Sequence, residues 1–323
     1  MARPRILQTR RWPEDAEKAL SDHFDVTLDE QDRPLSNQEL IESLKTHDGV
    51  AATVTDRFDD AVFSAIAGGP LKIIANFGVG VNHIDLAAAH RAGIEVSNTP
   101  GVLTDATADI ALTLMMMVMR RTGEGERELR DGAWTGWRPT HLLGRDLSGK
   151  TLGIIGMGRI GKATARRCAH AFGMKVVFYN RSAVPDMDDI GATQLDTVRD
   201  VCAAADIISL HCPGGDATRH ILDKAAIAAM PSHGVVINTA RGDVVDEDAL
   251  AEALSSGQIG GAGLDVFQGE PLINPALMAA PNTVFLPHMG SGTLETRNAM
   301  GMMVVDNLKA FFEGKTLPNP ATS

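Results

Sequence analysis

The sequence predicts an α/β protein built from two Rossmann-like, doubly wound domains with a cleft between them. The chain has 323 residues, more than one hydrophobic core usually holds, so we expect two domains. Short apolar runs alternate with segments of helical spacing along most of the chain, as is typical of βα units on parallel sheets. A long apolar helix candidate lies between the two series of such units and is expected to join them.

The first series covers about the first hundred residues. Its apolar runs predict strands at residues 5–8, 24–28, 49–52, 71–77 and 94–97. One long helix is then expected from residue 105 to about 131. Its apolar half contains four methionines, which we interpret as core or subunit interface, because Met side chains fill irregular gaps: Met115, Met116, Met117 and Met119.

The second series begins after a loop at residues 132–141, which contains Trp134 and Trp137 and is too rich in turn formers for regular structure. Strands are predicted at residues 151–155, 175–179, 207–211, 235–238, 263–266 and 283–286. Helical spacing lies between most of them, which is the doubly wound pattern. A last helix is expected at about residues 293–312.

Charge and cysteine content exclude several classes of protein. Acidic residues number 41 against 30 Lys and Arg, and a net charge of −11 repels nucleic acid and anionic membranes. The three cysteines, Cys168, Cys202 and Cys212, fit neither a disulfide framework nor a metal site. The chain shows neither a signal core nor an apolar run of about 20 residues. We therefore expect a cytoplasmic protein with no metal, nucleic acid or membrane partner.

A glycine motif directly after the strand at 151–155 predicts a dinucleotide site. Gly156 would make the tight turn, Gly158 would let the backbone approach a pyrophosphate, and Gly161 would let helix and strand pack closely. The motif alone is weak evidence, but here it follows a strand and opens a helix. The alternative is a glycine-rich turn without a ligand.

The end of the next strand indicates which nicotinamide cofactor is preferred. Asn180 stands where an NAD enzyme places an acid for the ribose 2′-hydroxyl, and Arg181 and Ser182 follow it. An acid would repel the 2′-phosphate of NADP, whereas a guanidinium and a hydroxyl can bind it. NADPH is therefore predicted over NAD. The alternative is that Arg181 is an ordinary solvated arginine and that Asn180 still serves NAD.

Three later strands each end in a polar segment, at the edge where doubly wound sheets bind ligands. Arg241, Glu270 and His288 lie there. Reduction of a 2-keto acid needs a cation for the carboxylate, a proton donor for the carbonyl oxygen and a group that keeps the donor protonated. Each residue alone has an ordinary structural explanation. Together, downstream of a dinucleotide motif, they favour this chemistry.

With these motifs, the sequence resembles the D-isomer-specific 2-hydroxyacid dehydrogenases, most closely their glyoxylate and hydroxypyruvate reductase branch. The resemblance covers nearly the whole chain. Its specific segments lie at residues 76–85, 98–109, 147–161, 238–246, 263–271 and 286–288. It implies a flavodoxin-like substrate domain at 1–99 and 290–323 and an NAD(P)-binding Rossmann domain at 100–289.

The resemblance also implies roles for individual residues. Arg241 and His288 would bind substrate and be catalytic, Glu270 would be the carboxylate partner of His288, and backbone amides of Val79 and Gly80 would bind the substrate carboxylate. The positions that match cofactor contacts in the family, beyond the motif residues already named, are Thr107, Arg159, Ile160, Cys212, Thr239, Asp265 and Gly290. The Trp134–Trp137 loop resembles one that reaches the neighbouring active site, which implies a homodimer; simple interface packing is the other interpretation.

The predicted function is NADPH-dependent reduction of a small 2-keto acid, such as glyoxylate or hydroxypyruvate, to the D-2-hydroxy acid. One alternative is an NAD-dependent dehydrogenase for D-lactate, formate or phosphoglycerate; the absence of a regulatory extension after Ser323 argues against the last. Another is a nucleotide-sensing, co-repressor-like binding protein. Gly214 and Gly215 depart from the family pattern, in which a leucine and a threonine are frequent, so the loop there is expected to meet the cofactor differently.

Overall fold

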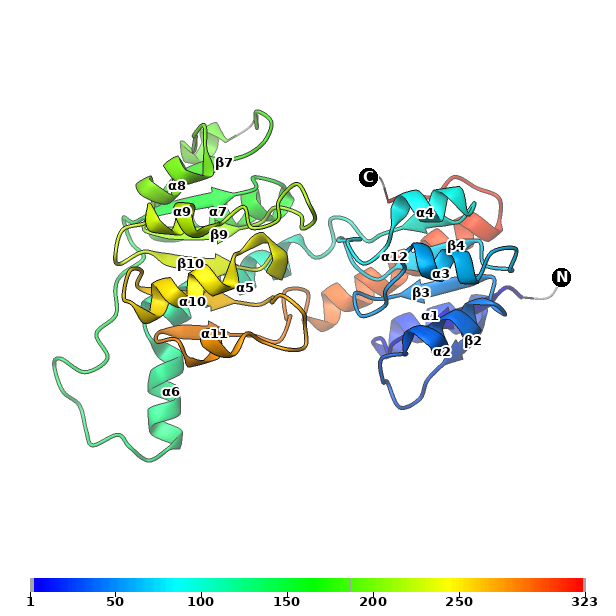
Figure 1. Ribbon diagram of the computed structural model, residues 1–323, viewed down its shortest axis with the longest axis horizontal. Coiled ribbons are helices and arrows are strands. Elements are labelled where there is room, and N and C mark those ends of the chain that lie inside the picture. The colour runs from blue at the N-terminus through cyan, green and yellow to red at the C-terminus, as the bar shows by residue number, and fades with distance from the viewer. Residues whose placement is uncertain (1–2, 186, 322–323) are drawn as a thin grey trace. The chain divides into compact units, whose positions relative to one another are not determined.

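The computed structural model describes residues 3–185 and 187–321. The chain divides into two compact units. Unit 1 is formed by residues up to Leu103 together with those from Gly292 onward, and unit 2 by Thr104–Ser291. Each unit is a parallel β-sheet with helices on both faces, so the predicted α/β fold class is confirmed (Figure 1).

The sheet of unit 1 has five strands in the order β2-β1-β3-β4-β5, and every paired strand runs parallel to its neighbour. The strands match the predicted positions, with shorter ends in three cases. Their bounds are β1 Arg5–Gln8, β2 Asp25–Leu28, β3 Gly49–Ala52, β4 Ile73–Asn76 and β5 Glu95–Ser97. The order reverses between β1 and β3, which places a topological switch point at the carboxyl ends of these two strands.

Successive strand residues of unit 1 face opposite sides, as the pleat requires. Ile73 joins a core with α1 (Glu14–His23) and α12 (Leu294–Phe312), whereas Ile74 joins one with α2 (Asn37–Leu44), α3 (Asp60–Ala65) and α4 (Leu86–Arg91). The chain end thus returns to complete one face of the sheet that the chain start forms (Figure 1). The sequence pattern predicted the last helix but not its packing.

The sheet of unit 2 has seven strands in the order β12-β11-β10-β9-β6-β7-β8, again with parallel pairing. Their bounds are β6 Thr151–Ile155, β7 Lys175–Tyr179, β8 Thr193–Gln194, β9 Ile207–Leu210, β10 Val235–Asn238, β11 Gly261–Leu264 and β12 Thr283–Phe285. Strand β8 was not predicted, because two exposed residues carry no apolar pattern. The prediction for β11 began and ended two residues too late, because Gly261 and Ala262 carry little hydrophobic signal.

Two cores cover the faces of this second sheet. One packs α5 (Thr104–Met119) and α7 (Arg159–Phe172) on the strands, and includes Met115 and Cys168. The other packs α8 (Val198–Ala204), α9 (Lys224–Ala228), α10 (Glu247–Ser255) and α11 (Pro275–Ala279). Met115 and Met119 are buried and Met116 is exposed, so the methionine stripe is only partly core.

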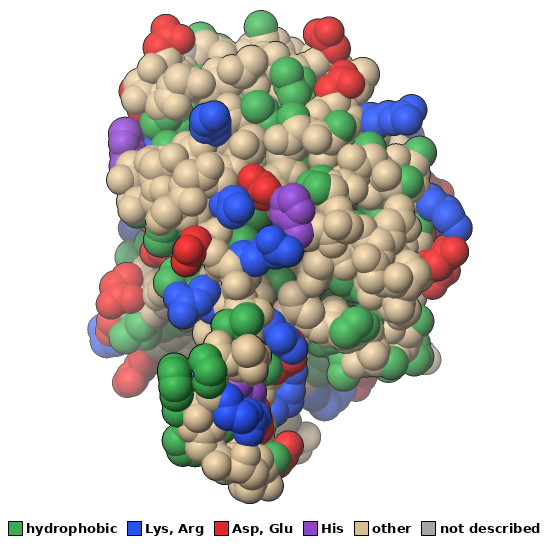
Figure 2. Space-filling view, turned by 90° about the vertical axis from the view of Figure 1, so that its left-hand side faces the viewer, with side chains coloured by type: hydrophobic (Ala, Val, Ile, Leu, Met, Phe, Trp, Pro, Cys, Tyr) green, Lys and Arg blue, Asp and Glu red, His purple; other side chains and the backbone are tan. Residues whose placement is uncertain are grey.

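The single helix predicted from residue 105 to about 131 is wrong. The structure has two helices, α5 and α6 (Thr122–Arg130), because Arg121 adopts a left-handed conformation with φ of 51°. Gly123 and Gly125 follow within four residues, in the first turn of α6. Past α6 the chain projects from unit 2, and Figure 2 shows hydrophobic side chains gathered beside basic ones on a projecting segment. The exposed apolar residues here include Leu129, Trp134, Trp137 and Leu143.

All three cysteines are reduced and buried in unit 2. Burial raises the pKa of Cys168 and of Cys202 to about 12, and that of Cys212 to about 11. Among the residues that the structure describes, no helix combines the length and apolar character needed to cross a membrane.

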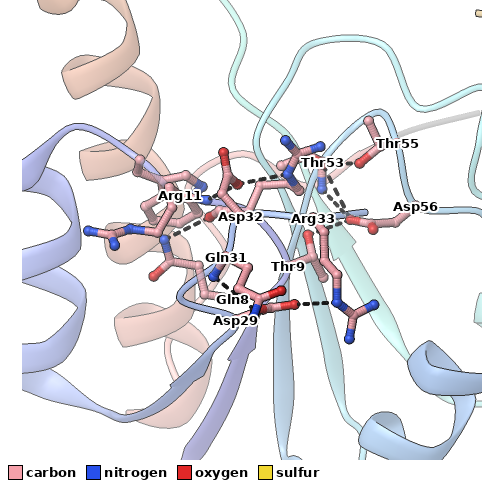
Figure 3. Close-up of polar contacts among 12 residues, drawn as sticks. Gln8, Thr9, Arg11, Asp29, Gln31, Asp32, Arg33, Thr53, Thr55 and Asp56 are labelled. Carbon is pink, nitrogen blue, oxygen red and sulfur yellow. Dashed lines mark hydrogen bonds and ion pairs between the residues drawn. The ribbon is translucent and has the colours of Figure 1, made fainter. Parts of the chain in front are cut away.

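The switch point of unit 1 holds a network of polar contacts, drawn in Figure 3. Asp56 is 3% exposed and accepts hydrogen bonds from Thr9 Oγ1 at 2.5 Å and from the Thr53 N–H at 2.8 Å. Burial raises the pKa of Asp56 despite these donors. On the same edge, Arg10 donates to Asp32 at 2.8 Å, which fixes the loop after β2.

Candidate active site

The glycine motif of unit 2 forms a tight turn between β6 and α7, at the switch point where β6 lies beside β9. Gly156 has φ of 96°, and a Cβ on it would lie 2.5 Å from the backbone nitrogen of Cys212. A Cβ on Gly161 would lie 2.3 Å from the carbonyl oxygen of Gly156. Both glycines are therefore required by close backbone approach. Gly158, at the helix N-cap, faces open space instead.

The side chain of Asn180 connects this turn to the end of β7. Its Oδ1 accepts a hydrogen bond from the Met157 N–H at 3.2 Å, and its Nδ2 donates to the Ser182 carbonyl at 3.0 Å. Gln194 donates to the backbone of both Asn180 and Ser182. Arg181 and Ser182 are exposed, and Arg181 has no side-chain partner among the described residues. A guanidinium and a hydroxyl are thus available beside the turn.

The turn and its surroundings fit a dinucleotide. Arg159 and Ile160 begin α7, where backbone N–H groups are free to bind a pyrophosphate. Thr239, after β10, has a buried Oγ1 without a hydrogen-bond partner in the described chain. An orphaned hydroxyl at the ligand edge of the sheet can be satisfied by a bound cofactor.

His288 and Glu270 form a hydrogen-bonded pair. His288 Nδ1 lies 2.8 Å from Glu270 Oε2, and each side chain is 33% exposed. The other carboxylate oxygen accepts a hydrogen bond from the Phe267 N–H at 2.9 Å. Burial raises the pKa of Glu270, but the hydrogen bond and charge of His288, the Phe267 N–H and the Arg241 charge outweigh it, and the net pKa is lowered. Glu270 therefore stays ionised and fixes the proton on Nδ1.

Asp265 holds the segment that carries His288. Its carboxylate accepts hydrogen bonds from the N–H groups of Met289 at 2.6 Å and Gly290 at 2.8 Å, and its carbonyl oxygen accepts one from the His288 N–H at 2.9 Å. His288 has φ of 53°, a conformation that such contacts can hold. Burial raises the pKa of Asp265, which is 1% exposed. Thr107 Oγ1 donates to the Gly290 carbonyl at 3.2 Å.

Arg241 follows β10 in a turn shaped by Asn238. The Asn238 side chain donates to the Arg241 carbonyl at 2.8 Å and accepts from the Ala240 N–H at 3.0 Å. Burial lowers the pKa of Arg241, while the charges of Glu270 and Asp243 raise it. The guanidinium Nη1 donates to the Ala240 carbonyl at 2.6 Å, and among the described residues no carboxylate lies within ion-pair distance of the guanidinium. Its fork can therefore bind an incoming carboxylate.

A close backbone contact connects the Arg241 and Glu270 segments. A Cβ on Gly242 would lie 1.9 Å from the carbonyl carbon of Phe267 and 2.2 Å from the nitrogen of Gln268. Only glycine fits at this position. Gln268 in turn donates from its backbone to Glu247 at 2.7 Å and from its side chain to Val245 at 2.8 Å. The loop that carries Glu270 is thus anchored on the strand segment that carries Arg241.

Val79 and Gly80 lie in unit 1, in the loop after β4. The Gly80 and Gly78 carbonyls accept hydrogen bonds from Asn76 Nδ2 at 3.1 and 3.0 Å, and the Val79 carbonyl accepts one from Asn98 Nδ2 at 2.8 Å. In the described chain the amide N–H groups of Val79 and Gly80 have no acceptor. The loop carbonyls are therefore satisfied and two amides are available for an anion.

Sequence reasoning missed the residues that shape these segments. Asn238, Asn76 and Asn98 each bond backbone groups of the same or a neighbouring loop. Asn238 and Asn76 are the last residues of β10 and β4, and Asn98 directly follows β5, so an Asn at the end of a strand was an available signal for such a turn. Asp243 and Gln268 gave no such signal, because their partners lie more than 20 residues away.

Comparison with known proteins extends this description. The model of the "D-isomer specific 2-hydroxyacid dehydrogenase, NAD binding domain" family matches residues 112–290. Glyoxylate reductase of Thermococcus litoralis is 41% identical over 322 residues, covering 98% of this chain and 96% of the relative. A crystal structure of an NADPH-dependent glyoxylate/hydroxypyruvate reductase from Sinorhizobium meliloti, with NADP and malonate, is 35% identical with a TM-score of 0.88, covering 99% and 97% of the two chains.

A glyoxylate reductase structure from Paecilomyes thermophila is 33% identical with a TM-score of 0.86, and covers 99% of both chains. The dinucleotide turn and the residues around His288 therefore belong to a nicotinamide-dependent oxidoreductase that acts on CH–OH groups. Within that class, the chain belongs to the D-isomer-specific 2-hydroxyacid dehydrogenase family, as its sequence indicated, and it is similar to glyoxylate reductases over nearly its whole length.

Proposed function

We propose that this protein reduces a small 2-keto acid, such as glyoxylate or hydroxypyruvate, to the D-2-hydroxy acid, with NADPH preferred. The observation that carries the proposal is the 2.8 Å hydrogen bond between His288 Nδ1 and Glu270. It leaves Nε2 as the ring nitrogen that can donate a proton to a carbonyl oxygen. The names of the glyoxylate reductase relatives support the substrate class.

The proposed mechanism assigns one task to each of the three side chains. Reduced nicotinamide, when bound, supplies the hydride. Arg241 binds the substrate carboxylate and polarises the adjacent keto carbonyl. His288 gives its Nε2 proton to the carbonyl oxygen, and Glu270 stabilises the imidazolium from the Nδ1 side until that transfer. The same anion-binding role for the amides of Val79 and Gly80 remains a prediction from the family resemblance.

The proposed preference for NADPH rests on the end of β7. Asn180 brings no negative charge, and Arg181 is exposed without a side-chain partner among the described residues. A 2′-phosphate carries charge that such a guanidinium can bind, and Ser182 adds a hydroxyl. Arg159, Ile160, Thr239, Cys212, Thr107, Asp265 and Gly290 are proposed to line the remainder of the cofactor site.

Assembly and domain roles are also part of the proposal. We assign the substrate domain to unit 1 and the cofactor domain to unit 2. The exposed Trp134 and Trp137, at 50% and 82%, suit a homodimer in which their loop approaches the neighbouring active site. The cytoplasmic location, the keto-acid partner and the lack of a nucleic acid or membrane partner remain predictions.

Initial rates of NADPH and NADH oxidation with glyoxylate, hydroxypyruvate, pyruvate and phenylpyruvate test the proposal. We expect the highest kcat/KM with NADPH and either glyoxylate or hydroxypyruvate. A preference for NADH would overturn the cofactor assignment alone. Lack of turnover with all four acids would overturn the substrate class, and binding of either dinucleotide without turnover would favour a sensor instead.

A further inference from the structure

The glycine pair at 214–215 has a structural explanation that involves Asp243. Gly214 and Gly215 follow β9 in the loop that begins at Cys212. Asp243 lies two residues after Arg241 in the 3₁₀ turn Gly242–Val244. The Gly215 N–H donates to Asp243 Oδ2 at 2.9 Å, so the loop after β9 is bonded to the segment that carries Arg241.

A second bond connects the same two segments. The His220 N–H donates to the Asp243 carbonyl at 2.8 Å, so one residue contacts both ends of the loop. Within the loop, Thr218 Oγ1 donates to the Pro213 carbonyl at 2.5 Å and its N–H donates to the Gly215 carbonyl at 3.0 Å. The loop is therefore a closed turn fixed at two points on Asp243.

The absence of a side chain at Gly214 makes this arrangement possible. A Cβ on Gly214 would lie 2.6 Å from Asp243 Oδ1 and 3.0 Å from Arg241 Cγ. The carboxylate could move only by giving up its bond to Gly215, and Arg241 Cγ lies too near the backbone to move freely. Gly215 has φ of 111°, which favours glycine at the next position as well.

The second carboxylate oxygen of Asp243, Oδ1, is buried in a position that opposes folding. Asp243 Oδ1 is buried and has no hydrogen-bond partner among the described residues. A buried carboxylate oxygen without a donor opposes folding unless a nearby positive charge offsets it. Arg241 is that charge: burial lowers its pKa, and the charges of Glu270 and Asp243 oppose that lowering. Glu270 is also hydrogen-bonded to His288, and Asp243 is the second acid whose charge acts on Arg241.

We propose that Asp243 is a positioning residue for Arg241. Gly214 is present because the Asp243 carboxylate and the Arg241 side chain occupy the space beside it, and Gly215 because its positive φ brings its N–H to the carboxylate. The loop after β9, held by Asp243, packs along Arg241 Cβ and Cγ and sets where the guanidinium points. This inference rests on the proposed role of Arg241 in binding the substrate carboxylate.

Four variants test the proposal: D243A, D243N, G214A and the double variant D243A/G214A. Two kinds of measurement are made on each variant and on wild type. Steady-state kinetics give the KM for glyoxylate and the KM for NADPH. Calorimetry gives the Kd for oxamate, a keto-acid mimic that cannot be reduced. D216A, on the exposed part of the same loop, and G123A, whose Cβ would meet only ordinary contacts at 3.5 Å or more, are the matched controls.

We expect D243A to raise the glyoxylate KM and the oxamate Kd about tenfold, with the NADPH KM changed by less than about twofold. D243N keeps an oxygen for the Gly215 N–H and should stay within about threefold of wild type. G214A should weaken glyoxylate and oxamate binding as D243A does, and the double variant should lose less than the product of the two single losses, because both substitutions disrupt the contact with Asp243. D243S replaces D243A if thermal melting shows that D243A is unfolded.

Two results would overturn the role of Asp243 while leaving the proposed function intact. One is an active wild type whose D243A variant keeps the normal glyoxylate KM and oxamate Kd. The other is a double variant that loses the product of the two single losses, which would make the two sites independent. A wild type that neither reduces a keto acid nor binds oxamate would overturn both proposals together.

Discussion

His288 Nδ1 and Glu270 Oε2 lie 2.8 Å apart, although 18 residues separate them in the chain. The Phe267 N–H orients the second carboxylate oxygen, and Asp265 orients the backbone on the histidine side. Both partners of the hydrogen bond are therefore positioned by further hydrogen bonds to their own segments. The orientation of the imidazole depends on contacts outside the ring itself.

Substituting Glu270 by Gln tests whether the charge of this pair is needed. The amide oxygen can still accept from Nδ1, but it cannot stabilise an imidazolium by charge. We expect kcat/KM for glyoxylate to fall about a hundredfold or more, with NADPH affinity nearly unchanged. Stopped-flow turnover and fluorescence titration of NADPH measure the two quantities. E30Q, at an exposed acid in unit 1 with no hydrogen bond or ion pair among the described residues, is the control, and wild-type turnover in E270Q would refute the role.

The pH dependence of stability should reflect Asp56. Because burial raises the pKa of Asp56 above its unfolded value, ionisation opposes folding. The penalty is absent below the unfolded pKa of about 4, and it grows as pH rises through the unfolded and then the folded pKa. D56N removes this term while keeping an acceptor for the Thr53 N–H. We expect its Tm, relative to wild type, to rise between about pH 4 and pH 7.

Calorimetric melts of wild type, D56N and D56A across that range separate charge from hydrogen bonding. D56A should be less stable than D56N by about 1–3 kcal/mol, because Thr9 Oγ1 and the Thr53 N–H lose their acceptor. A Tm difference between D56N and wild type that does not change with pH would show that Asp56 does not titrate in this range.

The cofactor preference should depend on the charge at residue 180. N180D keeps an oxygen for the Met157 N–H but loses the amide donor to Ser182 and adds a negative charge. We expect kcat/KM with NADPH to fall about tenfold to a hundredfold, with NADH affected much less. R181A should weaken NADPH selectively too. Equal losses with both cofactors would indicate a general distortion of the turn.

Gly242 should tolerate no side chain. A Cβ there would lie 1.9 Å from the Phe267 carbonyl carbon, so either the Arg241 segment or the Glu270 segment must shift. We expect G242A to lose about 3 kcal/mol of stability and most of its turnover. Urea unfolding and initial rates measure both effects, with G123A as the tolerant glycine control. An active, fully stable G242A would contradict the close approach of these two backbones.

The exposed tryptophan loop should matter for assembly. Trp137 is 82% exposed and Trp134 50%, on a segment without regular structure. If the loop packs on a second copy, light scattering should give a dimer for wild type. For W134A/W137A it should give a monomer fraction that grows as the protein is diluted. A wild-type monomer at high concentration would refute the homodimer. An intact dimer in the double variant would place the interface elsewhere.

Local sequence signals were sufficient for most of the fold. Buried parallel strands such as β3 and β10 are continuous apolar runs, and the turn from Gly156 to Gly161 is encoded within six residues. The break at Arg121 was missed, because a left-handed arginine leaves no mark in periodicity; the glycines at 123 and 125 were the available signal. The family resemblance supplied the expectation that Glu270 accompanies His288, since spacing alone could not pair residues 18 positions apart.

The supporting contacts of the site could not be predicted for a different reason. Asp243 meets Gly215 only because β9 and β10 are adjacent in the sheet, a fact of topology rather than of local pattern. Gly242 likewise shows its constraint only once the Phe267 backbone is placed beside it. Such contacts depend on the folded arrangement of distant segments, so local sequence motifs do not reveal them.

The three native thiols have a practical consequence. With pKa values of about 11 and 12, roughly one thiol in ten thousand or fewer is ionised at neutral pH, and all three are shielded by packing. Maleimide dyes should therefore not react with the wild-type chain. Two surface cysteines, one introduced in each unit, would be the only labelled positions, and energy transfer between a donor and an acceptor dye could follow the separation of the units as ligand is added.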